Sequence, residues 1–142
     1  MLDALQFSLN KIALLGFIIY MGTAALLFSL YQFIYTRLTP HKEFRLIREN
    51  NVAAAVGLGG ALVGYAIPAG NIISYSANLL DFVVWALIAA VVQLLAFFIT
   101  HQVIRDLPGR IQRGEMAAAI YTAAVAISVG LLNAACMTPS NG

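Results

Sequence analysis

Charged residues are scarce in this chain of 142 residues, because Lys, Arg, Asp and Glu together make up 10% of it. An ordinary soluble domain has about 25% of these residues. Hydrophobic residues make up 61%, and the 8 basic and 6 acidic residues are too few to coat a soluble core of this size. The charges are also clustered, which leaves long uncharged segments that only lipid or other protein can cover. The composition therefore excludes an ordinary soluble protein.

Cysteine is almost absent too, since Cys136 is the one cysteine. A single cysteine excludes an intramolecular disulfide framework and any cysteine-rich zinc or iron–sulfur site. We interpret Cys136 as a small apolar residue near the end of a helix, with an intermolecular disulfide or a reactive thiol as the alternatives.

Residue patterns that would indicate an enzyme or a metal site are missing as well. His41 and His101 are 60 positions apart, and neither lies in a cysteine or carboxylate pattern that specifies metal ligands. The alternative is that their two loops meet, which would bring both histidines near Glu43 or Asp106. The sequence has no nucleophile elbow, and its glycine cluster does not follow a strand. We therefore expect no enzymatic activity, no metal and no cofactor.

Four long apolar segments are present, and each is long enough to cross a bilayer. They cover residues 12–35, 52–70, 79–100 and 116–135. We therefore expect an all-α membrane protein, with a single membrane domain over residues 1–142 and four transmembrane helices. The first segment is too long for the apolar region of a signal peptide. Pro68, followed by Gly70, is expected to kink or end the second helix.

Basic residues are concentrated in two of the three connections between these segments. The connections at residues 36–51 and 101–115 hold seven of the eight, whereas residues 71–80 hold none. The positive-inside rule then predicts that both charged connections are cytoplasmic, and that both termini and the third connection are on the periplasmic side of a bacterial inner membrane. Because basic residues beside membrane-length segments are topology signals, the net charge of +2 does not indicate a nucleic-acid partner.

Both charged connections also carry apolar residues at helical spacing. Phe44 and Ile47 are three positions apart, which predicts a short helix at the membrane surface that starts near Pro40. In the second connection, Pro108-Gly109 is expected to break such a helix. We interpret the basic residues of these connections first as topology signals, and four arginines are the candidates for the alternative, a docking patch for a cytoplasmic partner or anionic lipid headgroups. These four are Arg45, Arg48, Arg110 and Arg113.

The transition from a charged loop to an apolar helix occurs twice, 64 positions apart. The first copy reads Glu49-Asn50-Asn51-Val52-Ala53-Ala54-Ala55-Val56, and the second reads Arg113-Gly114-Glu115-Met116-Ala117-Ala118-Ala119-Ile120. Each copy lies between two apolar segments, and in the first copy Asn50 or Asn51 is expected to cap the helix that follows. The repeat predicts two tandem helical hairpins, residues 12–73 and 79–136, with the same orientation and a pseudo-two-fold axis along the membrane normal.

Small residues recur at every fourth position in the second and fourth apolar segments. They are Ala53, Gly57, Gly60, Ala61 and Gly64 in the second, and Ala126, Gly130 and Ala134 in the fourth. This small-xxx-small pattern lets helix backbones pack closely in lipid. We expect these two helices to make the central contacts, and their small-residue faces to join subunits into a homo-oligomer. The alternative is a helix that unwinds around a transported ion.

Three polar residues lie within or next to the apolar segments. Asp81, near the start of the third segment, is expected to cap that helix, with binding of a passing cation as the alternative. Gln93, near the middle of the same segment, is expected to hydrogen-bond to a neighbouring helix rather than to a substrate. With Asn133 in the fourth segment, these residues are the candidates to line a pathway through the membrane.

The first copy of the repeat, followed by Gly57-Leu58-Gly59-Gly60 and echoed by Gly114 to Ala119, resembles the YjfL-like family of small bacterial inner-membrane proteins (DUF350, UPF0719). The resemblance covers nearly the whole chain. Family members typically have Gly-Asn where this chain has Asn50-Asn51 and Gly114-Glu115, so each copy differs at one position. The resemblance implies a four-helix membrane protein of a family whose function is unknown, and it implies no catalytic residues. It also suggests a partnership with membrane-maintenance proteins of the phage-shock type at the cytoplasmic face.

Two classes of function fit these observations. In the first, which we favour, the chain is an oligomeric membrane scaffold or interaction protein whose basic loops recruit a partner or anionic lipid. In the second, it is an oligomeric channel or small transporter for ions or small solutes. We favour the first because a unit of 142 residues has little room for a pore and few polar groups within the membrane.

Overall fold

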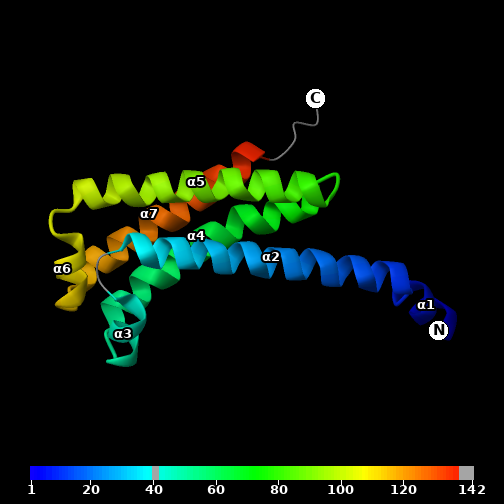
Figure 1. Ribbon diagram of the computed structural model, residues 1–142, viewed down its shortest axis with the longest axis horizontal. Helices are drawn as coiled ribbons and strands as arrows, with labels where there is room; N and C mark the ends of the chain where they lie inside the picture. Colours follow the sequence, from blue (N-terminus) through cyan, green and yellow to red (C-terminus); the bar gives the residue numbers. More distant parts are fainter. Residues whose placement is uncertain (40–41, 138–142) are drawn as a thin grey trace.

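The computed structural model describes residues 1–39 and 42–137, and every regular element within these ranges is a helix (Figure 1). The helices are α1 (Leu2–Ser8), α2 (Lys11–Leu38), α3 (Glu43–Arg48), α4 (Val52–Tyr75), α5 (Leu79–Val103), α6 (Leu107–Gln112) and α7 (Met116–Met137). Four of them, α2, α4, α5 and α7, are long and apolar enough to cross a membrane. The predicted all-α fold with four candidate membrane spans is confirmed.

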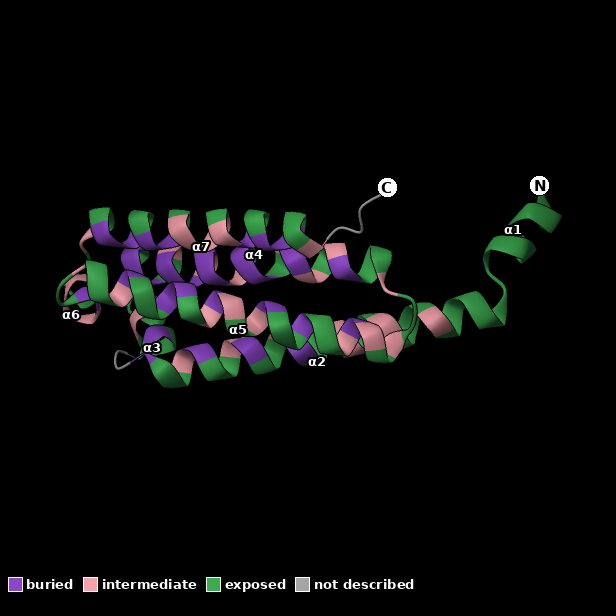
Figure 2. Ribbon diagram, turned by 90° about the horizontal axis from the view of Figure 1, so that it is seen from above, coloured by how far each residue is buried: buried purple, intermediate pink, exposed green. Residues whose placement is uncertain are grey.

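The four long helices lie along one another, and the short helices α3 and α6 lie at one end of the bundle (Figure 1). α4 and α7 are parallel, because their residues meet in the same order from the beginning to the end of both helices. α5 runs in the opposite direction and packs against both. The buried residues of α2 all lie in its carboxyl-terminal half. α1 and the beginning of α2 therefore extend past the bundle with their surfaces exposed (Figure 2).

Small residues set the close contact between α4 and α7. A side-chain carbon added at Gly60 would overlap Ala123, and one added at Gly64 would overlap Ala126. From the other helix, a carbon added at Gly130 would overlap the carbonyl group of Gly64. Close approach gives the van der Waals contact that holds helices together in lipid, where the hydrophobic effect does not. The prediction that these two helices make the central contacts is confirmed.

The small residues predicted from the sequence lie in this contact or directly beside it. Seven of them are buried and Ala126 is half-buried; the seven are Ala53, Gly57, Gly60, Ala61, Gly64, Gly130 and Ala134. Because these faces are covered within one chain, they are not available to a second copy. The expectation that they join subunits into an oligomer is therefore corrected.

Aromatic rings fill the contact between α2 and its neighbours α4 and α5. Tyr31 stacks on Tyr65 with ring centres 4.4 Å apart, and Tyr35 meets the ring of Phe97 edge-on at 4.9 Å. The hydroxyl of Tyr65 also donates a hydrogen bond to the Ala86 carbonyl of α5 at 3.2 Å. Because rings rather than small residues fill this contact, α2 approaches α4 less closely than α7 does.

All four long helices run further than predicted, and two short elements differ as well. α4 continues through a buried Pro68 to Tyr75, so of the two expected effects of Pro68 and Gly70, a kink or an end of the helix, the end is contradicted. Pro108 lies in the first turn of α6 and starts that helix rather than breaking it, since a first-turn residue needs no N–H donor. α1 has no counterpart among the predicted elements. The surface helix expected after Pro40 is α3, although Pro40 itself lies outside the described residues.

Candidate functional site

Two amide side chains donate hydrogen bonds to backbone carbonyls of neighbouring helices within the apolar part of the bundle. Nε2 of Gln93, on α5, lies 3.0 Å from the carbonyl oxygen of Gly64 on α4. Nδ2 of Asn133, on α7, lies 3.3 Å from the carbonyl oxygen of Ala89 on α5. Both side chains are buried. These bonds tie α5 to the central pair of helices.

Pro68 explains why the carbonyl of Gly64 accepts a bond from a side chain. In an α-helix this carbonyl would bond to the N–H four residues later, and proline has no N–H. Gln93, which is 2% exposed, supplies the missing donor from the next helix. The prediction that Gln93 bonds to a neighbouring helix is confirmed. This bond also explains how α4 continues past Pro68.

Of the three residues predicted to line a pathway, Asp81 lies away from the other two, at the start of α5. Gln93 and Asn133 are used in packing between helices, whereas Asp81 lies in the first turn of α5. The cap of α5 is Asn78, whose side chain accepts a bond from the Asp81 amide at 2.9 Å. Asp81 instead accepts a bond from the Ala77 amide at 3.0 Å. The expectation that Asp81 itself caps the helix is therefore corrected, because the position three residues earlier is already a good cap.

Asn51 joins the two charged connections at the other end of the bundle. Its side-chain oxygen accepts a hydrogen bond from the Ala54 amide at 3.0 Å, which caps α4 as predicted. Its side-chain nitrogen donates to the carbonyls of Ile111 and Gln112, at 3.0 and 3.2 Å, where α6 ends. One side chain thus starts a membrane helix and holds the opposite loop. The sequence indicated the first role, and no signal in it revealed the second.

α3 presents two of the predicted docking arginines to solvent. Arg45 pairs with Glu49 at 3.1 Å, and both side chains are more than half exposed. Arg48 is exposed and forms no ion pair with any residue of the described ranges. Because an exposed ion pair contributes little to stability, both guanidinium groups remain available to an anionic ligand.

The two predicted docking arginines next to α6 belong to a charge network. Arg110 and Arg113 contact Glu115 at 3.4 and 3.1 Å, and Arg113 also contacts Asp106 at 3.3 Å. The hydrogen bond with Asp106, aided by the one with Glu115, raises the pKa of the Arg113 guanidinium above its ordinary value. These arginines are partly neutralised within their own loop, so the stronger attraction for an anion lies on the α3 side.

Two hollows lie between the charged connections. One of about 380 Å³ is lined by Lys42, Arg45, Leu46, Glu49 and Gln112. The other, of about 550 Å³, lies around the junction of the two loops and includes residues of both, Arg113 among them. Basic side chains of both connections therefore border one continuous region of surface.

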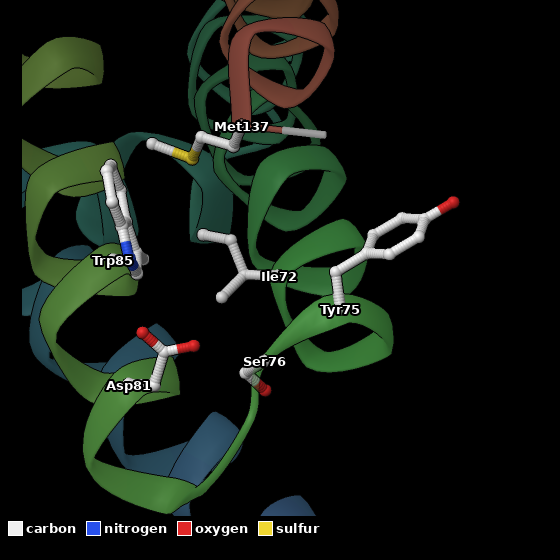
Figure 3. Close-up of a pocket in the computed structure, with 6 residues that line it drawn as sticks. All are labelled: Ile72, Tyr75, Ser76, Asp81, Trp85 and Met137. Carbon is white, nitrogen blue, oxygen red and sulfur yellow. The ribbon is translucent and has the colours of Figure 1, made fainter. Parts of the chain in front are cut away.

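A further hollow of about 200 Å³ lies at the opposite end of the bundle, where α4 ends and α5 begins (Figure 3). Asp81, Trp85, Ile72 and Met137 surround it from three helices, while the ring of Tyr75 is turned away (Figure 3). Asp81 is the one predicted site residue that borders a hollow at this end. Trp85 and Met137 are additional lining residues that the sequence did not single out for a site.

The described residues contain no group of three or more His, Cys, Asp or Glu side chains placed to hold a metal ion. His101 packs against the ring of Phe97. His41, the other member of the pair considered from the sequence, lies outside the described ranges. Cys136 is exposed.

Comparison with known proteins finds relatives along nearly the whole chain. The family described as Domain of Unknown Function (DUF350) matches residues 8–137. The chain is similar to the UPF0719 inner membrane protein YjfL of Escherichia coli K12, with 35% identity over 126 residues, which cover 89% of this chain and 96% of that relative. The protein of the same name from Escherichia coli O157:H7 has the same identity and coverage. No solved structure matches.

Proposed function

The chain belongs to the DUF350 family, and from this premise we propose that it is a non-enzymatic, multi-pass inner-membrane protein that acts as an oligomeric scaffold. The end of the bundle that carries α3 and α6 binds anionic lipid headgroups from the cytoplasmic side. The observation that carries this proposal is the pair of exposed arginines on α3, Arg45 and Arg48, beside a hollow shared with α6.

The proposed orientation follows from the distribution of charge. The end with α3 and α6 holds seven of the eight basic and four of the six acidic residues, a local net charge of +3. The positive-inside rule favours the cytoplasm for this end. Both termini and the turn between α4 and α5 then lie on the periplasmic side. The name of the Escherichia coli relatives supports the inner membrane as the location.

Two tandem hairpins are supported by the backbone. α3 begins and ends 64 positions before α6, and α4 begins 64 positions before α7. Asn50 and Gly114, which are also 64 positions apart, both have left-handed backbones, with φ of 65° and 77°. Glycine adopts this conformation freely, and asparagine adopts it more readily than most other residues. This preference explains why asparagine is tolerated where the second copy has glycine.

The hydrogen bonds that follow these two left-handed residues match as well. The Asn51 amide donates to the Leu46 carbonyl at 2.8 Å, and the Glu115 amide donates to the Arg110 carbonyl at 3.0 Å. Each bond spans five positions, so the two turns close in the same way. On this proposal α4 and α7 are equivalent helices that meet at the pseudo-two-fold axis.

Oligomer formation is assigned to the uncovered part of α2. A side-chain carbon added at Gly16 or Gly22 would meet no atom within 4 Å. Large apolar side chains beside them, including Phe17 and Ile18, are exposed. A helix face that combines glycine with uncovered apolar residues allows the α2 helix of a second copy to approach closely.

Native mass in a mild detergent tests this assignment. We expect the full chain to form an oligomer that Gly22→Leu weakens, because leucine would keep the second helix away. Gly70→Leu is the matched control, since Gly70 is exposed and also has open space around it but lies on α4. Equal loss of oligomer in both variants, or no oligomer in the unchanged protein, would contradict the role of α2.

Lipid retention tests the basic end. The protein is reconstituted in nanodiscs of phosphatidylglycerol and phosphatidylcholine and released from them in native mass spectrometry. We expect the released protein to retain phosphatidylglycerol selectively. Arg45→Ala combined with Arg48→Ala is expected to remove most of this selectivity, since each basic residue near an anionic surface contributes about 1 kcal/mol. Lys11→Ala is the control, because Lys11 is the one basic residue of the sequence outside the two charged connections. It lies at the start of α2, whereas the basic end of the bundle lies beyond the end of this helix.

The outcome separates two kinds of ligand. Selectivity that the double variant leaves unchanged would mean that α3 does not bind the lipid. An acidic surface on a cytoplasmic membrane-maintenance protein would then be the next candidate for the basic end.

The channel or small transporter is the second candidate, and one observation favours it. Oε1 of Gln93 is buried and has no hydrogen-bond partner among the described residues. A cavity of about 10 Å³ is lined by Gln93, Tyr31 and Thr122, among others, and this is about enough for one water molecule. Because Gln93 and Asn133 already bond helices within one chain, we rank this function second. Unchanged ion flux in vesicles on Gln93→Leu would remove this residue from any pathway.

A further inference from the structure

The hollow at the end of the bundle opposite the arginines has the properties of a cation site (Figure 3). We propose that it binds the ammonium group of an aminophospholipid headgroup. The site shares no residue with the basic end and takes a ligand group of opposite charge. The proposal therefore goes beyond the scaffold function and does not depend on it.

The charge of Asp81 is the first argument. Its carboxylate points toward the hollow (Figure 3), and its one side-chain hydrogen bond within the described residues comes from the Ala77 amide. Asp81 forms no ion pair with any described residue. Carboxylates at the basic end differ, because Glu49, Asp106 and Glu115 are each paired with an arginine. Asp81 thus keeps a negative charge that a ligand can neutralise.

The helix ends around the hollow leave the negative charge of Asp81 in place. α4 ends at Tyr75 with Ser76 as its cap, so the carboxyl end of this helix borders the hollow. The carboxyl end of a helix carries a partial negative charge and favours cations. The amino end of α5 has the opposite effect and offsets that of α4, which leaves the Asp81 carboxylate as the net charge beside the hollow. The sum favours a cation.

The walls of the hollow select an ammonium group over a metal ion. Trp85 forms one wall, Ile72 faces it and Met137 lies above (Figure 3). Hard metal cations require about six oxygen ligands, and the side chains that line this hollow offer fewer, because beside Asp81, Ser76 and Tyr75 the lining is an indole, an alkyl group and a thioether. An ammonium group is instead attracted to an aromatic face, best of all to tryptophan, while its N–H groups donate to a carboxylate. Asp81 and Trp85 together supply both interactions.

The position of the hollow identifies the source of the ammonium. Asp81 lies in the first turn of a membrane-spanning helix, and Trp85 lies one turn further along it. Tryptophan at such a position is typical of the membrane interface, at the level of the headgroups. An ammonium carried by a phospholipid is therefore already at the right depth. A free amine would have to enter from solution.

Trp85 is the one tryptophan of the chain, so its fluorescence reports on this hollow. We would titrate the full-length protein in a non-ionic detergent with short-chain phosphatidylethanolamine. Phosphatidylglycerol of the same chain length is the lipid without an amine, and ethanolamine is the free amine. We expect a saturable change in the emission of Trp85 with phosphatidylethanolamine and none with phosphatidylglycerol. Ethanolamine is expected to bind more weakly than the lipid.

Asp81→Asn keeps the shape and the hydrogen-bond acceptor of the side chain and removes its charge. We expect it to weaken binding about tenfold or more, which is the effect of losing a hydrogen bond to a charged group. Asp3→Asn is the matched control, since Asp3 is also a carboxylate in the first turn of a helix but lies on α1, away from the hollow. If Asp81→Asn does not fold, Met137→Lys tests the same site, because a tethered ammonium beside Trp85 should block the ligand.

Three results would overturn the proposal. The first is an equal response to phosphatidylglycerol, which would mean that the fluorescence reports on apolar chains rather than on the amine. The second is unchanged affinity in Asp81→Asn together with an unchanged response in Met137→Lys. The third is ethanolamine binding as tightly as the lipid, which would make the ligand a free amine and not a headgroup.

Discussion

The side-chain amide of Gln93 occupies the hydrogen-bonding position that Pro68 leaves vacant on α4. The two residues belong to different helices and are linked through the carbonyl of Gly64, 3.0 Å from the Gln93 nitrogen. A proline inside a membrane helix is tolerated where a neighbouring group satisfies the freed carbonyl. Here that group is a single glutamine, so the continuity of α4 depends on α5.

Gln93→Leu is expected to destabilise the protein by about 1–2 kcal/mol, because the Gly64 carbonyl would lose its donor in an apolar setting. Unfolding in mixed micelles with increasing denaturing detergent measures this change. Gln102→Leu is the matched control, since Gln102 is exposed on the same helix. Pro68→Ala restores the backbone N–H donor to the Gly64 carbonyl. In the Pro68→Ala protein, Gln93→Leu should therefore lower the free energy of unfolding by less. Equal cost with and without proline would show that the two residues are not coupled.

Gly130→Ala is expected to destabilise the contact between α4 and α7 by about 1–3 kcal/mol, because the added carbon would overlap the Gly64 carbonyl. Gly59→Ala is the control, since an added carbon there meets no atom within 4 Å. Alanine favours helix over glycine by about 0.5–1 kcal/mol, so the control should be neutral or more stable. The same unfolding measurement compares them. A stable Gly130→Ala would contradict the close approach of these helices.

Asn51 has two roles that different substitutions separate. Asn51→Ala removes both the cap and the bonds to the α6 end, and is expected to cost about 1–2 kcal/mol. Asn51→Asp keeps the cap and loses the donor, so hydrogen exchange at the Ala54 amide should stay slow while exchange in α6 accelerates. Asn10→Ala is the control, because Asn10 caps α2 with bonds to Ile12 and Ala13 alone. Slow exchange in α6 of the Asn51→Asp protein would argue against the tether.

Cys136 allows the orientation to be tested without a mutation. It is exposed near the end of α7, at the end of the bundle that we assign to the periplasm. A maleimide that cannot cross membranes is therefore expected to label it in spheroplasts without permeabilisation. Arg48→Cys in a Cys136→Ala background should react only after permeabilisation. The reverse pattern would invert the assigned topology.

The sequence predicted the four membrane spans because their apolar length is a local property. It also predicted the cap at Asn51 and the bond from Gln93 to another helix, since a capping residue and a buried amide each have a small set of partners. The end of α4 was mispredicted because the donor that compensates for Pro68 lies 25 positions away on another helix. Proline alone gives no sign of such a donor.

The small-residue faces show a similar limit. Their spacing predicted close packing at Gly60 and Gly64, and close packing is present. The pattern does not state whether the partner helix belongs to the same chain, because glycine allows approach by either. The hollow beside Asp81 could not be predicted either, because its lining residues come from helices that are far apart in the sequence, and Met137 is one of them.

The length of α2 has a consequence for the membrane around the protein. α2 has 28 residues and is about 42 Å long, whereas the 22 residues of α7 span about 33 Å. The hydrocarbon core of a bilayer is about 30 Å thick. α7 therefore matches this thickness, while α2 has to tilt or thicken the lipid beside it. The protein therefore presents spans of unequal length to the bilayer, and mismatch of this kind sorts proteins among membranes of different thickness.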